Sequence, residues 1–340
     1  MKVVSTLDKL KMPDDKNISK SSADNNSPLG NTSVVRVSAP ATVANLVCGF
    51  DILGMALNDP QDLMEVRLLA EPVIKIKHAD DYDLPVEPER NVAGAALIAL
   101  QEAYEKKVGF EVLVNKSIKP GSGLGSSAAS SAGAVVAANY LLGNIFSKPD
   151  LVRFAMNGEK VASGVKHADN LAPCIYGGIT LIRSILPLDI IPLSAPPLHV
   201  TVVHPQIEVK TSDARQILRK EVQLKSAIMQ WGNIAGLVTG LLKNDYELIG
   251  RSLEDVIIEP VRSILIPGFD EVKINSKEAG ALGGGISGSG PSIFMLSKEE
   301  ETARKVETIM KNVFQKIGVE FRTYVTFINQ TGVKLMPGDN

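Results

Sequence analysis

A glycine-rich loop that runs directly into a helix of small residues is the part of this sequence best suited to chemistry. The loop reads Lys119-Pro120-Gly121-Ser122-Gly123-Leu124-Gly125-Ser126-Ser127, and the run Ala128 to Gly133 holds only Ala, Ser and Gly. Glycines let backbone N–H groups close round an anion, and a helix start adds unpaired donors and a positive dipole end. A flexible linker is the alternative, but linkers rarely lead straight into a strong helix former. The pattern therefore predicts a phosphate site.

Two better-known nucleotide loops do not fit this pattern. A Walker A loop ends in Gly-Lys-Ser/Thr, whereas this loop ends in Gly125-Ser126-Ser127 and has the glycine spacing GxGxG rather than GxGxxG. A later run, Gly283 to Pro291, does match GxGxxG, but it follows a predicted helix and opens a predicted strand, which is the wrong order for a dinucleotide fold. A tight turn and a ligand-facing segment both explain that run, and its many glycines favour a ligand.

Composition makes a small molecule the expected partner. The chain has 340 residues, 44% of them hydrophobic and 22% charged, which is enough for a large core and two domains. A net charge of −2 without a dense basic block argues against nucleic acid and anionic membranes, and no apolar run reaches the roughly 18 residues of a membrane span. Cys48 and Cys174 are too few for a disulfide framework, so we expect buried thiols in a reducing, cytoplasmic compartment.

The apolar pattern predicts alternating strands and helices around the loop. A strand at Phe110–Val114 should lead into it, and the helix Ser126–Leu142 should leave it and pack on several sides, because Ala and Gly occupy nearly every face. Further strands are expected at Val34–Ser38, Leu63–Leu69, Val73–Lys77, His199–His204, Ser292–Leu296 and Phe321–Phe327, a hairpin at Ile175–Leu186, and helices near Arg90–Lys107, Asp150–Ala162, Gln223–Lys243, Phe269–Ala279 and Lys298–Gly318.

A proline-punctuated stretch at 186–197 divides the predicted elements into two groups. We therefore predict a disordered tail over 1–33, which has almost no apolar periodicity, an N-terminal domain over 34–190 that contains the phosphate loop and a C-terminal domain over 191–340. The oligomeric state stays open, and a homodimer is one outcome.

Three segments, in this order, resemble the three motifs of the GHMP small-molecule kinases: Ser38–Asp51, the loop Pro120–Ala128 and the late run Gly283–Pro291. The similarity extends from about Val34 to the C-terminus. It implies an α+β fold of two domains, a ribosomal-protein-S5-like N-terminal domain and a ferredoxin-like C-terminal domain. The first motif, with Ala-Asn-Leu-x-x-Gly-Phe-Asp, is most similar to the homoserine kinase branch, which implies ATP-dependent phosphorylation of the L-homoserine hydroxyl in threonine biosynthesis.

The resemblance also implies how ATP is held. The phosphates lie against a loop made of Pro120, Gly121, Ser122, Gly123, Leu124, Gly125, Ser126, Ser127 and Ala128. Ser127 and Glu159 would hold Mg²⁺, a hard ion that takes few protein ligands, although Glu159 alone would be read as a solvated surface residue. Asn91, in a Pro-x-x-Asn arrangement, corresponds to the adenine-contacting position, and a helix N-cap is its alternative role.

On the substrate side the resemblance implies a pocket for a zwitterion. Its residues are Asn45 and Asp51 for the ammonium group, Arg215 and Arg262 for the carboxylate, and His167 and Asn170 facing the substrate. Guanidinium groups suit a carboxylate because they bind it bidentately. Without the resemblance, the arginines would be surface ion pairs and His167 a core histidine.

Asn170 lies where the mevalonate kinase branch places an aspartate base, eleven residues after the metal glutamate. An amide cannot accept a proton at neutral pH, so we expect Glu159, Ser127 and Asn170 to act by positioning and charge neutralisation, without a general base. Two rivals are another GHMP kinase, for mevalonate, a sugar or shikimate, and a silent ligand-binding member. Asn170 and the two arginines argue against the first, and intact Glu159 and loop serines argue against the second.

Overall fold

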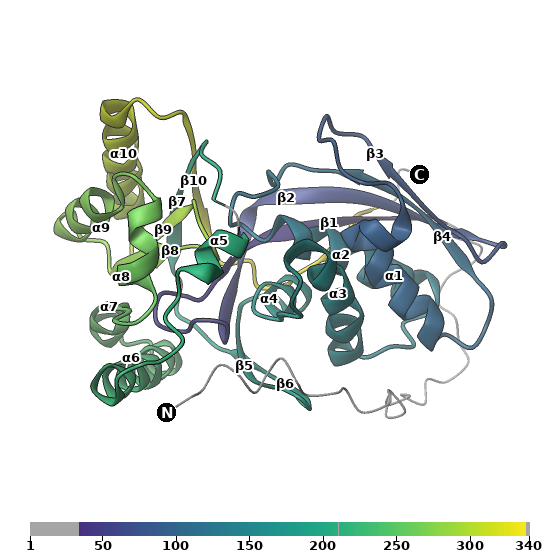
Figure 1. The fold of residues 1–340 in the computed structure, drawn as a ribbon, viewed down its shortest axis with the longest axis horizontal. Helices are drawn as coiled ribbons and strands as arrows, with labels where there is room; N and C mark the ends of the chain where they lie inside the picture. The colour runs from purple at the N-terminus through teal and green to yellow at the C-terminus, as the bar shows by residue number, and fades with distance from the viewer. Residues whose placement is uncertain (1–33, 210, 338–340) are drawn as a thin grey trace.

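The computed structural model describes residues 34–209 and 211–337, so the predicted tail over 1–33 lies outside the described residues. Two sheets lie side by side, and helices pack against each of them (Figure 1). The α+β fold of two units predicted from the sequence is confirmed. Within the described ranges, no helix is both long and apolar enough to cross a bilayer.

The first unit is a seven-stranded sheet with four helices on one face (Figure 1). Its strand order is β11-β1-β2-β4-β3, and β5 pairs with β2 and β6. The strands are β1 (Val34–Ala44), β2 (Leu53–Leu69), β3 (Ile74–His78), β4 (Gly109–Asn115), β5 (Ile179–Ile185), β6 (Leu188–Leu193) and β11 (Lys334–Leu335). The helices are α1 (Val92–Ala103), which follows the 3₁₀ turn η2 (Pro88–Arg90), α2 (Ser126–Leu141), α3 (Lys148–Ser163) and α4 (Leu171–Tyr176).

Helix α2 is the centre of this unit. It packs against α1, α3 and α4 and against strands β1 and β2, as its small residues predicted. Close approach needs them: a Cβ added at Gly133 would lie 2.3 Å from the Met64 methyl group, and one at Gly158 of α3 would lie 2.2 Å from Ser131 Oγ. The start of α2 is therefore fixed from several sides.

The second unit is a four-stranded sheet in the order β10-β7-β9-β8. Its strands are β7 (His199–Pro205), β8 (Gly283–Ile286), β9 (Ile293–Ser297) and β10 (Phe321–Phe327), and its helices are α5 (Thr211–Gln216), α6 (Leu224–Lys243), α7 (Tyr246–Ser252), α8 (Glu259–Arg262), the 3₁₀ turn η3 (Ser263–Leu265), α9 (Phe269–Glu278) and α10 (Glu300–Ile317). In α10 the apolar residues Val306, Met310 and Val313 recur at helical spacing and are buried against the sheet.

The chain crosses between the units more than once. The predicted domain boundary at residue 190 falls inside β6, whose pairing with β5 extends the first sheet to Leu193. The short strand β11 then returns to pair with β1, and Leu57 of β2 bridges Ile328 after β10. The division of the chain into domains stays a prediction, and a cut near residue 194 would leave the first sheet more complete.

Several elements differ from the sequence prediction, among them strand β2, which begins at Leu53 and not at Leu63. Strand β1 does not end at Ser38 but continues to Ala44. Its pairing with β2 shifts register between Pro40 and Thr42, and this irregularity accommodates the proline inside the strand. The expected hairpin at Ile175–Leu186 begins instead at Ile179, since α4 continues to Tyr176 and is followed by Gly177 and Gly178, both at positive φ. The glycines before Ser287 form the buried strand β8 rather than a turn.

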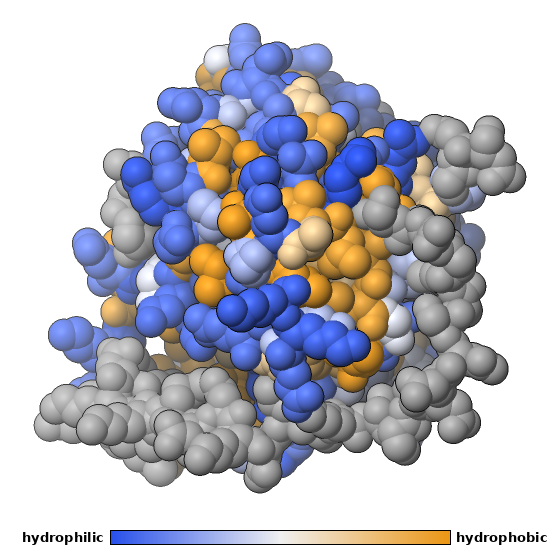
Figure 2. All heavy atoms as spheres, turned by 90° about the vertical axis from the view of Figure 1, so that its right-hand side faces the viewer, coloured by the Kyte–Doolittle hydropathy of each residue, from blue (hydrophilic) through white to orange (hydrophobic). Residues whose placement is uncertain are grey.

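Figure 2 shows the end of the first unit that lies to the right in Figure 1. Hydrophobic residues gather in the middle of this face, with hydrophilic residues around them. On the solvent side of the sheet, charged pairs such as Lys77–Glu111 and Arg36–Glu65 cover neighbouring strands. The three motifs singled out in the sequence lie elsewhere, where the two units meet.

Candidate active site

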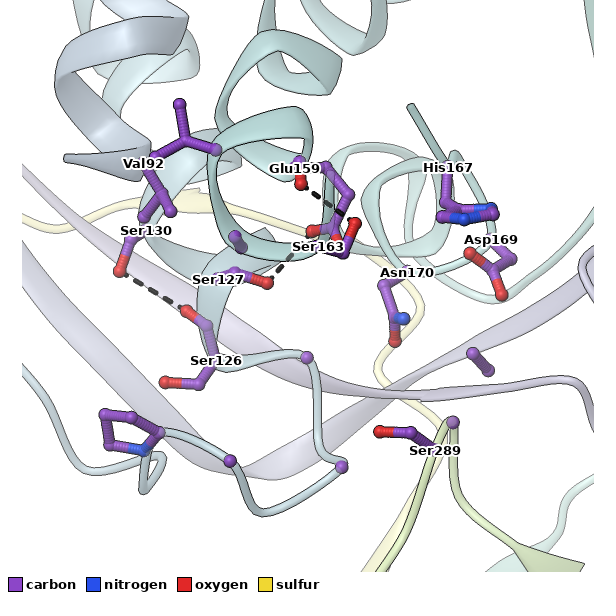
Figure 3. Close-up of a pocket in the computed structure, with 18 of the residues that line it drawn as sticks. Val92, Ser126, Ser127, Ser130, Glu159, Ser163, His167, Asp169, Asn170 and Ser289 are labelled. Carbon is purple, nitrogen blue, oxygen red and sulfur yellow. Dashed lines mark hydrogen bonds between the residues drawn. The ribbon is translucent and has the colours of Figure 1, made fainter. Parts of the chain in front are cut away.

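A cavity of about 420 Å³ brings the three motifs together. The predicted residues that line it are Asn45, Asp51, Pro120, Gly121, Gly123, Gly125, Ser126, Ser127, Glu159, His167, Asn170, Arg215 and Arg262. Ser126 and Ser127 lie on one side of it and His167 and Asp169 on the other, with Glu159 between them (Figure 3). The predicted residues Asn91, Ser122, Leu124 and Ala128 are buried and lie behind this lining.

The loop presents backbone amides to the cavity. Helix α2 starts after Gly125, which has φ 69°, and no side chain caps its first turn. Gly121 and Gly123 also have positive φ, 75° and 80°, which a residue with a Cβ rarely adopts. Uncapped N–H groups at the start of a 16-residue helix suit an anion, and this geometry supports the phosphate site, which stays a prediction.

The first and third motifs hold this loop in place. The Thr42 amide donates to the Leu124 carbonyl at 3.0 Å, and Ser287 Oγ donates to the Gly123 carbonyl at 2.7 Å. A Cβ at Gly123 would lie 2.6 Å from the Gly290 carbonyl oxygen, so the two glycine-rich runs approach backbone to backbone. Both explanations of the late run contain part of the answer: it forms a strand and a turn, and its Gly288 and Ser289 line the cavity.

Lys116 and Asp62 form a buried ion pair beneath the loop that the sequence analysis did not identify. Lys116 Nζ donates to Asp62 Oδ2 at 2.6 Å, to Ser130 Oγ at 2.7 Å and to the Ser126 carbonyl at 3.1 Å. Burial raises the pKa of Asp62, and Lys116 opposes this shift. The pair ties the end of β4 to the first turn of α2, and Lys116 also lines the cavity.

Ser127 and Glu159 meet at the cavity wall. Ser127 Oγ donates to Glu159 Oε2 at 2.9 Å, and Ser163 Oγ donates to the Glu159 carbonyl at 3.0 Å. Burial is the main cause that raises the pKa of Glu159. The described residues contain no cluster of three or more His, Cys, Asp or Glu side chains for a metal. One partly exposed carboxylate and one hydroxyl nevertheless fit a divalent ion such as Mg²⁺, which takes most of its oxygen ligands from water and phosphates.

In the part of the cavity where the sequence predicts the substrate, the structure pairs two residues that were predicted for opposite ends of the ligand. Arg215 on α5 donates to both oxygens of Asp51, at 3.0 and 3.3 Å, and His167 Nδ1 lies 3.7 Å from Asp51 Oδ1. Two atoms here have no partner among the described residues although they are buried: Arg215 Nε and His167 Nε2. Buried polar atoms without partners indicate a place where a ligand supplies them.

Arg262 is fixed more firmly than Arg215. Only 4% of it is exposed, and it donates to the carbonyls of Ala214 at 3.0 Å and Gly288 at 3.1 Å. Its guanidinium lies 4.9 Å from the centre of the Phe50 ring, which Arg215 also faces at 5.9 Å. Burial lowers the pKa of Arg262 to about 10, so it stays charged at neutral pH. Phe50 thus holds both arginines on one ring, a role that the sequence analysis did not predict.

Asn45 braces the first motif. It has φ 77°, and Leu46 and Val47 also have positive φ, so three successive residues with side chains are left-handed. The Asn45 amide oxygen accepts from the Asp51 amide at 3.0 Å, and its nitrogen donates to the Gly288 carbonyl at 2.9 Å. This bracing positions the Asp51 carboxylate, while a direct contact between Asn45 and an ammonium group stays a prediction.

Two other asparagines are held by their surroundings. Asn170 accepts from Thr42 Oγ1 at 2.7 Å, which leaves its NH₂ group as a donor. Asn91 is the N-cap of α1: its oxygen accepts from the amides of Ala93 and Gly94 at 2.9 and 3.1 Å. The capping alternative for Asn91 is therefore observed, and its contact with adenine stays a prediction.

Asp169 is a cavity residue that the sequence analysis passed over. It is 4% exposed and lines the cavity beside His167 and Asn170. Burial, with the nearby charges of Asp51 and Glu159, raises the pKa of Asp169 to about 7. Its place in the segment His167-Ala168-Asp169-Asn170 was a signal that could have identified it. The cysteines behave as predicted: both are free and buried, and burial raises the pKa of Cys48 to about 12.

Comparisons with known proteins agree with this geometry. The family model described as GHMP kinases N terminal domain matches residues 91–178, and the model described as GHMP kinases C terminal matches residues 237–316. A homoserine kinase of Chloroherpeton thalassium is 48% identical over 82% of this chain and 92% of its own length. One of Methanocella arvoryzae is 41% identical over 90% of this chain and 98% of its own. The crystal structure of homoserine kinase from Cytophaga hutchinsonii has a TM-score of 0.87 and 48% identity, covering 91% of this chain and 99% of that one.

Proposed function

The chain belongs to the GHMP kinases, and we propose that it transfers the γ-phosphoryl group of ATP to the hydroxyl of L-homoserine, giving O-phospho-L-homoserine for threonine biosynthesis. Sequence identity above 40% with chains named homoserine kinase, over most of their lengths, supports the substrate. One observation within this chain carries the proposal: a single cavity joins an uncapped helix N-terminus to a pocket of opposite charges.

The charged pocket matches an amino acid alcohol. A carboxylate between Arg215 and Arg262 would meet two guanidinium groups, one of which has a buried Nε without a partner. The ammonium group would then form an ion pair with the Asp51 carboxylate. Asp169, which lines the same cavity, would supply a second negative charge when it is ionised. Binding would replace the Asp51–Arg215 ion pair by two ion pairs to the substrate, so neither charge is left unpaired in the closed site.

The transfer step needs little activation of the hydroxyl. Its oxygen attacks the γ-phosphorus in line while the bond to the β,γ-bridging oxygen breaks, ADP leaves, and the hydroxyl proton passes late to an oxygen of the transferred phosphoryl group. Loop amides and the start of α2 stabilise the charge on the equatorial oxygens. The Asn170 NH₂ group would orient the substrate by donating a hydrogen bond to it near the attacking hydroxyl, because the Asn170 oxygen already accepts a hydrogen bond from Thr42. Ser127 and Glu159 would hold Mg²⁺, which neutralises phosphate charge when bound.

The location of the reaction follows from its chemistry. ATP and a free amino acid are substrates of cytoplasmic metabolism, and two buried, free cysteines are compatible with a reducing compartment. We therefore place the enzyme in the cytoplasm. Adenine should lie near Pro85 and Val92, which line the cavity next to the capping residue Asn91.

A panel of acceptors tests the proposal. The full chain is incubated with ATP and Mg²⁺ and, in parallel, with homoserine, mevalonate, galactose or shikimate, and ADP release is followed. ADP should appear with homoserine at a rate at least about 100-fold above each other acceptor, because only homoserine satisfies both poles of the pocket. Equal or faster turnover of another acceptor would refute the substrate assignment, and no turnover of any would refute the kinase assignment.

A further inference from the structure

The side chain of Gln230 joins two segments that carry opposite poles of the charged pocket. It belongs to α6, at the lower edge of the second unit in Figure 1, and is 6% exposed. Its Nε2 donates to the Cys48 carbonyl at 2.8 Å, and its Oε1 accepts from the Val256 amide at 3.0 Å. A backbone carbonyl only accepts and a backbone amide only donates, so these two partners fix the orientation of the Gln230 amide group.

The first partner, Cys48, lies in the turn that positions the Asp51 carboxylate. Within this turn the Gly49 amide donates to the Asn45 carbonyl at 2.8 Å. Asn45 and Asp51 both have positive φ, 77° and 61°, which residues with side chains rarely adopt. Such a conformation persists only where the surrounding structure holds it. The hydrogen bond from Gln230 to the Cys48 carbonyl supplies part of that support.

The second partner, Val256, lies at the start of the segment that ends in Arg262. Beside it, the Asp255 carboxylate accepts from three successive backbone amides, which are those of Ile257 at 2.8 Å, Ile258 at 2.9 Å and Glu259 at 3.1 Å. The turn closed by Asp255 leads directly into α8, where the Arg262 amide donates to the Ile258 carbonyl at 3.1 Å. A displacement of Val256 therefore displaces the Arg262 guanidinium.

We propose that Gln230 is a positioning residue for homoserine, which sets the separation between the Asp51 carboxylate and the Arg262 guanidinium. The inference rests on the proposed function and assigns a role in substrate binding to a residue outside the cavity lining. A substrate that binds through two charged groups requires one separation of their partners, because charge-assisted hydrogen bonds form at about 2.7–2.9 Å. Gln230 holds that separation through the backbone on both sides.

Two other contacts limit the effect of losing Gln230. The Gly288 carbonyl accepts from both Asn45 and Arg262, at 2.9 and 3.1 Å, and the Phe50 ring centre lies 4.9 Å from the Arg262 guanidinium. These contacts remain when Gln230 is replaced, so the pocket should loosen without losing its fold. We therefore expect homoserine affinity to fall about tenfold, as for the loss of one hydrogen bond.

Steady-state kinetics of Gln230→Met tests the proposal, because methionine has nearly the same length but no amide group. The KM for homoserine should rise about tenfold, while the KM for ATP stays within about twofold and kcat within about threefold. Asn233→Leu is the matched control. It also removes an amide of α6 that bonds to this segment, since Asn233 Nδ2 donates to the Glu254 carbonyl at 2.9 Å, but it leaves both Gln230 hydrogen bonds in place. Its KM for homoserine should stay within about twofold of the unaltered chain.

The split between KM and kcat separates positioning from a structural role. A structural role would lower the fraction of folded enzyme, and therefore kcat, with an unchanged KM for homoserine. That result, or an equal rise in the KM for ATP, would overturn the proposal. Failure of the unaltered chain to phosphorylate homoserine would overturn the proposed function as well. Normal turnover of the unaltered chain with an unchanged KM in Gln230→Met would overturn only the positioning role.

Hydrogen exchange gives a test in the unaltered chain, which does not depend on how a variant folds. If the Gln230 hydrogen bonds favour homoserine binding, homoserine must favour those hydrogen bonds to the same extent. Homoserine, added to the chain saturated with a non-hydrolysable ATP analogue, should therefore slow exchange of the Val256 amide about tenfold. The Leu248 amide, which donates to the Asp245 side chain at 2.9 Å in the same unit, should exchange at an unchanged rate. No slowing at Val256, or equal slowing at both amides, would overturn the proposal.

Discussion

Glu159 and Ser127 share a hydrogen bond at the cavity wall, where the Glu159 carboxylate is half-buried and has no basic side chain bonded to it among the described residues. We expect Glu159→Gln to lower kcat by at least about 100-fold, because the metal and the phosphate charge it neutralises would lose their main protein ligand. ADP release at saturating ATP and homoserine measures this, repeated over a Mg²⁺ titration. Glu254→Gln, at an exposed residue, is the matched control. Near-normal turnover of Glu159→Gln would remove it from the mechanism.

Arg215 is the arginine of the proposed substrate pocket that can be removed with least damage, since its side chain is about a third exposed while Arg262 is buried. Arg215→Ala should raise the KM for homoserine about 10- to 100-fold, as expected for one charge-assisted hydrogen bond. The KM for ATP should stay within about twofold, and Arg215→Lys should recover part of the loss. If the KM for ATP rose instead, Arg215 would belong to the phosphate side.

Asp169 should make homoserine binding depend on pH. Its pKa is raised to about 7, so it is largely protonated at pH 6 and ionised at pH 8. The KM for homoserine should therefore fall as the pH rises through 7, because the ionised acid attracts the ammonium group. Asp169→Asn should remove this dependence and leave a high KM at every pH. A kcat that follows the same titration, with a constant KM, would instead identify Asp169 as a proton acceptor.

Ionisation of Asp169 should also lower the stability of the fold as the pH rises, although it strengthens homoserine binding over the same range. Between about pH 4 and 7 the folded protein keeps a proton on Asp169 that the unfolded chain releases, so this group lowers the free energy of unfolding as the pH rises. Asp169→Asn removes that loss. Its urea midpoint should exceed that of the unaltered chain at pH 8 and approach it at pH 5, and equal differences at both pH values would contradict the raised pKa.

At the scale of single elements, the start of α2 is the most sensitive position. Gly125 has φ 69°, and a Cβ there would lie 2.0 Å from Thr42 Oγ1 and 3.1 Å from Asn170 Oδ1. Gly125→Ala should therefore abolish tight ATP binding in calorimetry. Gly143, just past the other end of α2, has φ 87° and open space around it, so Gly143→Ala should lose only about 1–2 kcal/mol of stability and bind ATP normally. Equal ATP affinity in both variants would contradict the role of the loop.

Elements with strong periodicity were predictable from the sequence. Strand β10 was predicted with its observed bounds, and α6 and α10 to within two residues at each end, because their apolar residues repeat at one period. Helix α2 was predicted equally well for another reason, since its Ala-rich sequence is a strong helix former that directly follows the glycine loop. Strand β8 was not predicted, since Gly283, Gly284 and Gly285 have no side chains to show a strand pattern. The short helices α5, α7 and α8 contain too few residues for a period, and tertiary contacts define them.

The candidate site was predictable where a motif is local and not where it depends on long-range contacts. The loop and the late glycine run could be recognised from residue types alone. The Lys116–Asp62 pair joins residues 54 positions apart, and the contact of Phe50 with Arg215 and Arg262 joins segments from both units. Nothing in the local sequence indicates such partners, whereas the fold brings them together.

For the whole molecule, the cavity depends on both units at once. The first unit supplies the loop, Glu159 and the carboxylates, and the second supplies Arg215, Arg262 and the turn at Gly288. Ser292 Oγ donates to the Ser122 carbonyl at 2.7 Å, so the late run of the second unit directly supports the loop of the first. A change in the angle between the units would move the arginines relative to the phosphates, which is why positioning alone can control transfer.

A crystal structure with a non-hydrolysable ATP analogue and homoserine tests the central claim most directly. We expect triphosphate density against the backbone amides between Pro120 and Ser127, and homoserine with its carboxylate at Arg215 and Arg262 and its ammonium group at Asp51. The homoserine hydroxyl should point at the γ-phosphate. Triphosphate density away from this loop, with the amides of Gly123 and Gly125 left to solvent, would contradict the account.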